Sequence, residues 1–258
     1  MEIRNHRLTI AYDGTLFAGW QIQANPATVQ GHLERVLERC WGEHLTLYGS
    51  GRTDSGVHAD GQVASFKAPA KFKSLAALQA ALNYYLPPQI RVTRARYAAD
   101  DFHARFSAKG KEYRYRICNH PFHDPFELNR SWHVPRPLNI TAMRQAARLF
   151  VGEHDFASFT SNPGYARATT VRRVTRVSIS ASGPLITVSV RGGGFLYRMV
   201  RNLVGALVKV GLGRLTVSEV TQILAAKQRR VAPNTAPACG LYLHKVFYPD
   251  NFYQEKPL

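Results

Sequence analysis

The chain has 258 residues, with 34 Lys and Arg against 17 Asp and Glu, so its formal net charge is +17. Hydrophobic residues make up 45% and aromatic residues 11%, which is enough for a sizeable core and excludes a disordered or low-complexity chain. Because the cations are spread along the whole sequence, they predict an anionic partner and favour RNA over a membrane surface.

The cysteines and the apolar stretches indicate the compartment. Three cysteines, at positions 40, 118 and 239, are odd in number and lack Cys-x-x-Cys spacing, which argues against a disulfide framework or a cysteine zinc site. The first residues have no signal-peptide core, and the most apolar stretch, 203–212, is interrupted by Lys209. We expect a reducing, cytoplasmic compartment and no membrane segment.

The first half of the chain predicts alternating strands and helices. Apolar alternation through Leu8, Ile10 and Tyr12 predicts a strand that ends at the Asp13-Gly14 turn, and Thr28 is a candidate N-cap for the following helix. The remaining predicted elements are strands at 45–48, 62–66 and 90–97 and a helix at 75–84. Together they predict a first lobe, residues 1–105, in the order βαββαβ.

The second predicted lobe covers residues 106–258 and mixes helices and strands in the same way. A strand is predicted at 112–118, followed by a Pro- and His-rich loop at 119–137. The other expected elements are helices from the Asn139 cap to Val151, at 195–210 and after Thr216, and strands at 171–179, 185–190 and 241–247. We find no fixed-period repeat, so the pattern favours an α+β fold with two similar halves.

A glycine-rich loop carries the first candidate site. Residues 49–59 place Asp54 between glycines, with Arg52 two positions earlier. Glycines allow a ligand to approach the backbone closely, and a guanidinium favours the ionised carboxylate that acts as a nucleophile or base. Local composition alone equally fits an Asx-turn, in which Asp54 bonds its own backbone.

Two further segments can contribute to a site. On the strand at 112–118, Tyr113 and Tyr115 share one face, where they fit either core packing or stacking on a base. On the predicted helix at 195–210, Arg198, Arg201 and Gly205 share a face that is either solvated or turned toward a cleft. A buried Arg201 needs a carboxylate partner, and Asp54 is the candidate.

Metal and cofactor chemistry lack their usual motifs. His120, His123, Asp124 and His133 lie in the proline-broken loop, where no helix or strand fixes their geometry, so we predict no metal site. Because the sequence has no P-loop, dinucleotide-binding or zinc-deaminase motif, it favours an enzyme without a cofactor. Residues 100–111, including Arg105, mix cations with aromatics and suit either RNA contact or a linker between lobes.

The chain contains several short motifs, in this order: Tyr12-Asp13-Gly14, Phe17-Ala18-Gly19-Trp20-Gln21, residues 51–59, residues 102–108, Tyr113-Arg114-Tyr115, Met199-Val200-Arg201-Asn202 and Gly240-Leu241-Tyr242-Leu243. Taken together, this ordered set resembles the tRNA pseudouridine synthase A family over nearly the whole chain. Ser55 stands where alanine is common in that family, which is a change between small residues.

The resemblance implies isomerisation of uridine to pseudouridine at positions 38, 39 and 40 of the tRNA anticodon stem-loop, without a cofactor or metal. It implies that Asp54 is the nucleophile, and it leaves open attack on the sugar C1′, attack on the uracil C6 and removal of a sugar proton. Arg201 would keep Asp54 ionised. Tyr113 would stack on the uracil and assist removal of the C5 proton.

The resemblance also implies contacts to RNA and a fold. A target base inside a stem must be flipped out, and Arg52 is the candidate for filling the gap or holding the flipped strand. Leu241 would form an apolar wall beside the base, with Arg105 and His58 as further substrate contacts. The implied fold is α+β, with two similar ferredoxin-like lobes that share a mainly antiparallel sheet, a basic cleft between them, and a homodimeric assembly.

Two other function classes fit parts of the sequence. A non-catalytic RNA-binding or RNA-remodelling protein on the same scaffold explains the charge equally well, but it does not require Asp54, Tyr113 and Arg201 together. A glycosidase-type hydrolase would pair Asp54 with Asp100 or Asp101 at a defined separation.

Overall fold

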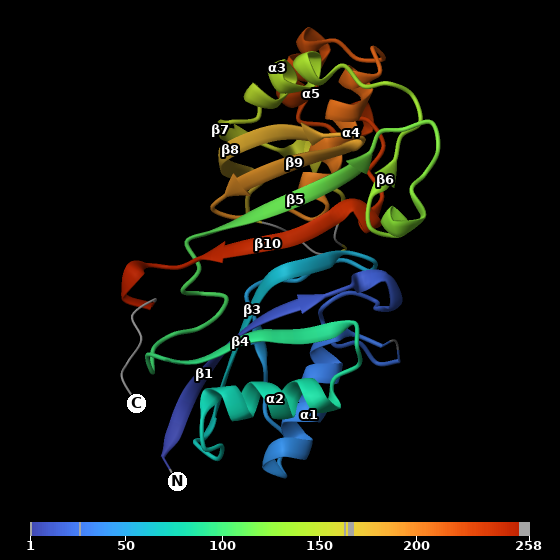
Figure 1. Ribbon diagram of the computed structural model, residues 1–258. Helices are drawn as coiled ribbons and strands as arrows, with labels where there is room; N and C mark the ends of the chain where they lie inside the picture. The colour runs from blue at the N-terminus through green and yellow to red at the C-terminus, as the bar shows by residue number, and fades with distance from the viewer. Residues whose placement is uncertain (1, 26, 163, 165–167, 253–258) are drawn as a thin grey trace. The chain divides into compact units, whose positions relative to one another are not determined.

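The computed structural model describes residues 2–25, 27–162, 164 and 168–252, which form two compact units (Figure 1). Unit 1 contains the described residues up to 109 together with those from 243 onward, and unit 2 contains those between 110 and 242. Strand β10 (Leu241–Phe247) begins in unit 2 and continues into unit 1. Both units combine helices with mainly antiparallel strands, which confirms the α+β class.

Unit 1 is a sheet with two helices on one side. Its strand order is β4-β1-β3-β10, with the short β2 paired to β3, and β1 is antiparallel to both β3 and β4. Figure 1 shows α1 and α2 against one side of these strands. The elements are β1 (Ile3–Tyr12), α1 (Val29–Trp41), β2 (Tyr48–Gly49), β3 (His58–Pro69), α2 (Leu75–Tyr85) and β4 (Ile90–Ala98).

The predicted periodicities explain the core of unit 1. Leu8 and Ile10 point to the same side of β1 and are fully buried, as are Leu33 and Leu37 of α1. Burying each such side chain contributes roughly 1.5–3 kcal/mol. The predicted N-cap is confirmed, because the Thr28 side chain accepts a hydrogen bond from the Gly31 N–H.

The other face of β1 and β4 carries a row of cations. In the register of these strands, Arg7 lies opposite Arg96, and Thr9 lies opposite Arg94. These four residues line a shallow hollow on the sheet. We call Arg7, Arg94 and Arg96 the arginine strip. Neither β1 nor β4 contains an Asp or Glu.

Unit 2 repeats the combination of sheet and helices. Its strand order is β5-β9-β8-β7, these neighbours are antiparallel, and β6 pairs with β5 in parallel. Helix α3 packs on β8 and α4, and α4 also packs on β5. The elements are β5 (Gly110–Cys118), β6 (Trp132–His133), α3 (Ile140–Arg148), β7 (Gly152–Asp155), β8 (Val171–Ser182), β9 (Leu185–Gly192), α4 (Met199–Gly211) and α5 (Val217–Ala226).

Some predicted boundaries are wrong for local reasons. Helix α4 begins at Met199 and not at 195, because Arg198 has a left-handed backbone with φ of 58°. The Met199 N–H donates to the Leu196 carbonyl across this turn. The apolar spacing of α4 therefore extends back to Leu196, although the helix itself does not. Likewise, α3 ends at Arg148, before the predicted end at Val151, which is exposed.

Two other predictions need correction. The stretch at 119–137 contains β6, so it is not a continuous loop. The strand predicted at 45–48 is reduced to Tyr48–Gly49. The backbone of Leu47 bonds side chains of α1 instead of a strand: its N–H donates to Glu34 and its carbonyl accepts from Gln30.

Candidate functional site

The loop that carries Asp54 lies in unit 1 and is bound to the segment that follows β1. The Trp20 N–H donates to the Thr53 carbonyl (3.1 Å), and the Gly56 N–H donates to the Phe17 carbonyl (3.3 Å). The side chains of Tyr12 and Thr53 also share a hydrogen bond of 2.8 Å. Burial raises the pKa of the Tyr12 hydroxyl, so this hydroxyl keeps its proton at neutral pH.

Close backbone contact explains two glycines of the first motif. Gly19 has φ of +94°, and a Cβ added there would lie 2.5 Å from the Thr53 carbonyl oxygen. A Cβ on Gly14 would lie 2.0 Å from the carbonyl oxygen of Val57. Residues 12–19 therefore pack backbone against backbone on the Asp54 loop, and only glycine fits at both positions.

A buried amide supports the start of the same loop. Gln62 is fully buried on β3, where its Oε1 accepts from the Ser50 hydroxyl (2.6 Å) and its Nε2 donates to the Gly51 carbonyl (2.9 Å). Gln62 belongs to the strand predicted at 62–66, but its sequence context predicts no role for it. Its only signal was a polar side chain in an otherwise buried strand pattern.

His58 supports the loop from the side of β1. The ring is buried, and its Nδ1 accepts a hydrogen bond from the Gly14 N–H (3.0 Å), which leaves the ring proton on Nε2. An Asp13 carboxylate oxygen lies 3.3 Å from the same Nδ1. The predicted substrate contact of His58 stays a prediction, whereas its contact with the turn after β1 is observed.

The two predicted RNA-binding arginines of unit 1 are both exposed. The Arg52 Nε donates to the Gln21 Oε1 (3.1 Å), which links the Asp54 loop to the residue after Trp20. The Arg105 guanidinium lies over the ring of Phe106, 5.5 Å from its centre. Arg52 thus has a defined neighbour on the first motif, and Arg105 has one in its own segment.

Unit 2 contains the other predicted site residues. Tyr113, Tyr115 and Ile117 are buried on one face of β5, which confirms the predicted alternation. The Tyr113 ring makes an edge contact with Phe195, with ring centres 5.2 Å apart. Leu241 is buried at the start of β10.

Arg201 is anchored to the segment before β10. Its Nε donates to the Ala236 carbonyl (2.7 Å), and the Ala236 N–H donates to the Arg201 carbonyl (3.2 Å). The hydroxyl of Tyr115 donates to the next carbonyl, that of Pro237 (2.8 Å). Gly205 of α4 allows this segment to approach closely, because the Asn234 carbonyl oxygen would lie 2.3 Å from a Cβ there.

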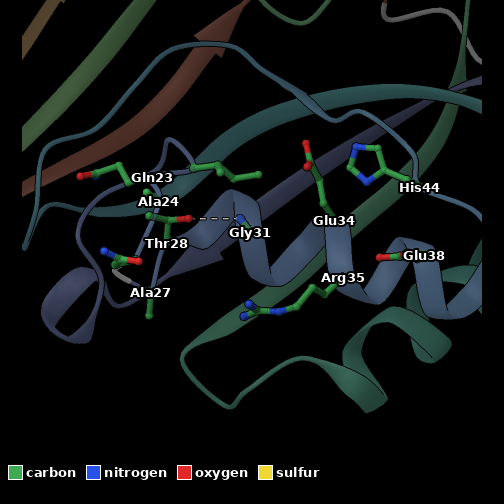
Figure 2. Close-up of a pocket in the computed structure, with 11 residues that line it drawn as sticks. Gln23, Ala24, Ala27, Thr28, Gly31, Glu34, Arg35, Glu38 and His44 are labelled. Carbon is green, nitrogen blue, oxygen red and sulfur yellow. Dashed lines mark hydrogen bonds between the residues drawn. The ribbon is translucent and has the colours of Figure 1, made fainter.

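A surface pocket of about 290 Å³ lies beside the start of α1 (Figure 2). Figure 2 shows Glu34, Arg35 and Glu38 along the helix and Thr28 at its start, bonded to Gly31. Asp54, Arg52 and His58 are not among the described residues that line this pocket. The pocket is therefore separate from the loop that carries the predicted nucleophile.

The described part of the chain contains no group of three His, Cys, Asp or Glu side chains that could hold a metal ion. No helix in this part of the chain combines the length and apolar character that a bilayer span requires.

Comparison with known proteins gives matches over most of the sequence. The family model described as tRNA pseudouridine synthase matches residues 8–107 and 146–249. The chain is 48% identical over 249 residues to the tRNA pseudouridine synthase A of Methylacidiphilum infernorum, covering 96% of this chain and 97% of the relative. It is 51% identical to the protein of that name from Solidesulfovibrio magneticus, covering 94% and 90%, and 49% identical to that from Syntrophotalea carbinolica, covering 94% and 95%.

Proposed function

The chain belongs to the tRNA pseudouridine synthase family, and we propose that it isomerises uridine to pseudouridine at positions 38, 39 and 40 of the tRNA anticodon stem-loop. The reaction breaks the bond between the sugar C1′ and the uracil N1 and forms one between C1′ and C5. Asp54 is the proposed nucleophile. The observation that carries this assignment is the set of hydrogen bonds and backbone contacts that fix the Asp54 loop.

A fixed carboxylate suits each route to this product. Attack on C1′, attack on C6 and removal of a sugar proton all need an ionised oxygen held at one place beside the flipped nucleotide. The loop meets this requirement because backbone atoms of Thr53 and Gly56, on both sides of Asp54, are bonded to the segment after β1. Fixing the loop in advance reduces the reorganisation needed when RNA binds.

Residues of the second unit have proposed roles around the uracil. Arg201 pairs with the Asp54 carboxylate, Tyr113 stacks on the base and assists loss of the C5 proton, and Leu241 forms an apolar wall. The anchoring of Arg201 to Ala236 supports the first role, because it limits the positions that the guanidinium can take. Arg52 and Arg105 are the proposed RNA contacts of the first unit, and His58 is a further proposed substrate contact.

Two lobes make up the proposed architecture. Residues 1–105 form a lobe that carries the catalytic loop, and residues 106–258 form a similar ferredoxin-like lobe that completes a basic cleft. Within the second range, the described residues from 243 onward group with unit 1, and residues 253–258 lie outside the described part. The enzyme acts as a homodimer in the cytoplasm, where tRNA is available. The sheet and helices found in each unit support the two-lobe proposal.

Release of tritium from C5-tritiated uridine in unmodified tRNA tests the function, because formation of the bond to C5 displaces that hydrogen. We expect release by the wild-type chain and a loss of about a thousandfold or more in Asp54→Asn, at concentrations where both bind tRNA equally. Wild-type binding without release would favour a non-catalytic RNA-binding protein and would contradict the proposal.

A matched variant separates the isomerase from a hydrolase. Asp101→Asn removes an exposed carboxylate that a glycosidase-type mechanism could use. We expect this variant to release tritium at the wild-type rate and the product to be pseudouridine. Free uracil as the product, together with loss of turnover in Asp101→Asn, would instead indicate hydrolysis.

A further inference from the structure

We propose that Gln21 and Gln30 are positioning residues for Arg52, and that Glu34 sets the direction of the hydrogen-bond chain that joins them. The inference rests on the proposed function, in which Arg52 contacts the RNA beside the flipped nucleotide. It adds to that function the residues that hold the Arg52 guanidinium in place.

The chain of hydrogen bonds runs from α1 to the Asp54 loop. The Gln30 Nε2 donates to the Glu34 Oε1 (3.0 Å), and the Gln21 Nε2 donates to the Gln30 Oε1 (2.8 Å). The Gln21 Oε1 in turn accepts from the Arg52 Nε (3.1 Å). Glu34 and Gln30 are both buried, so the anchored end of the chain is shielded from water.

Glu34 determines which way each amide turns. Its Oε1 accepts two hydrogen bonds, from Gln30 and from the Leu47 N–H (3.0 Å), so Gln30 must present its NH₂ group to Glu34. The Gln30 oxygen then faces Gln21, so Gln21 must present its own NH₂ group as the donor. The Gln21 oxygen is thereby turned toward Arg52. This is the orientation that Arg52 needs, because a guanidinium can only donate hydrogen bonds.

Further contacts lock Gln30. Its Oε1 also accepts from the Ile22 N–H (3.2 Å), and its Nε2 also donates to the Leu47 carbonyl (3.0 Å). Both donors and both acceptor positions of the amide are therefore used, and a flipped amide would place NH₂ against N–H and oxygen against oxygen. A satisfied buried amide of this kind holds one orientation.

The hydrogen bond to Gln21 gives the Arg52 side chain a preferred orientation. An exposed arginine samples many rotamers, and each phosphate contact must overcome the entropy of ordering it. The bond from Nε to Gln21 restricts the side chain before RNA binds and uses only one of its five donors. Gln21 therefore affects tRNA binding and turnover only through Arg52.

Gln21→Met tests the chain because methionine keeps the length of the side chain and removes both polar atoms. We expect kcat/KM for tritium release from tRNA to fall about fivefold to tenfold, which corresponds to the typical net contribution of one intramolecular hydrogen bond. The control is Gln23→Met in the same loop, whose Nε2 donates to the Ala18 carbonyl, away from Arg52. This control should retain wild-type kcat/KM.

A double-mutant cycle with Arg52→Ala decides between positioning and general damage to the loop. If Gln21 acts through Arg52, adding Gln21→Met to Arg52→Ala lowers kcat/KM no further, and both single variants melt at the wild-type temperature within about 2 °C. An equal fold-loss in the Arg52→Ala background, or wild-type kcat/KM in Gln21→Met, would overturn the inference.

Failure of the inference and failure of the proposed function give different results. Absence of tritium release from the wild-type chain contradicts the function itself. Wild-type release together with full activity of Arg52→Ala leaves the isomerase reaction intact and overturns the positioning chain, because Arg52 then has no effect to transmit.

Discussion

His6 is a histidine in the aromatic core of unit 1, and its surroundings give it a measurable pH dependence. Its ring stacks on Phe66, with centres 4.7 Å apart and planes within 8°, and makes edge contacts with Trp41 and Tyr97. Burial lowers the pKa of His6 to about 4, while its hydrogen bond with the Arg4 carbonyl opposes the shift. The folded chain therefore holds the neutral ring at neutral pH.

The lowered pKa predicts acid sensitivity of the folded state. Between pH 6.5 and about 4 the unfolded chain binds a proton at His6 that the folded chain does not, so this contribution to stability is complete above pH 6.5 and is lost as the pH falls. We expect the drop in unfolding free energy from pH 7.5 to pH 5 to be about 2 kcal/mol smaller in His6→Phe than in wild type. Urea unfolding at both pH values measures the unfolding free energies, and an identical drop in the two proteins would contradict the lowered pKa of His6.

At this same scale, the sequence reveals charged site residues more readily than the neutral ones that support them. Asp54 and Arg52 stand out because glycines and a charge pair are unusual in a short loop. Gln62 and Gln21 do not, because an amide in a strand or turn has no periodic signal, and its role depends on partners such as Ser50 that become neighbours only after folding. Motif resemblance identified where the Asp54 loop is, but not what holds it.

Helix α5 shows how a short sequence signal fixes an element. The Thr216 side chain accepts from the Glu219 N–H, and the Glu219 carboxylate accepts from the Thr216 N–H and hydroxyl, which forms a capping box. These bonds lower the pKa of Glu219, so the box is complete at neutral pH. The helix then places Val220 and Ile223 in the core of unit 2.

Removing the cap should loosen this helix without touching the candidate site. Thr216→Ala is expected to lower the unfolding free energy by about 1 kcal/mol and the melting temperature by about 2–4 °C. Ser218→Ala changes an exposed hydroxyl in the same turn and serves as the control. Calorimetry of the three proteins checks the prediction, which fails if both variants melt together.

Elements with caps and long periodic faces were predicted well, whereas short or strained ones were not. Thr28 and Asn139 cap their helices as expected, because an N-cap acts through its own next residues. By contrast, β6 and β7 depend on pairing with distant strands, and the start of α4 depends on the left-handed backbone of Arg198. Such long-range or strained features leave no pattern in a window of sequence.

The whole chain has a net charge of +17, and the arginine strip shows one place where the cations gather. Like charges directly opposite each other on a sheet repel, so an anion in contact with both Arg7 and Arg96 would lower the electrostatic energy of this pair. The Arg7 side chain is also held in place, because it donates to the Phe252 carbonyl (3.0 Å) and lies over the Tyr248 ring. A polyanion such as tRNA, the proposed substrate, can offset this repulsion along both strands.

Salt dependence measures how many of these cations meet phosphates. Wild-type affinity for tRNA should fall steeply as salt rises, because each neutralised phosphate releases a counterion. Replacing Arg94 and Arg96 with Ala should weaken binding similarly for different tRNAs and reduce the slope of log affinity against log salt by about 2. Arg35→Ala removes an exposed cation from α1, on the helical side of unit 1, and should leave the slope unchanged. An equal loss of slope in Arg35→Ala would mean that net charge alone governs binding, and an unchanged slope in the double variant would exclude the arginine strip from the RNA contact.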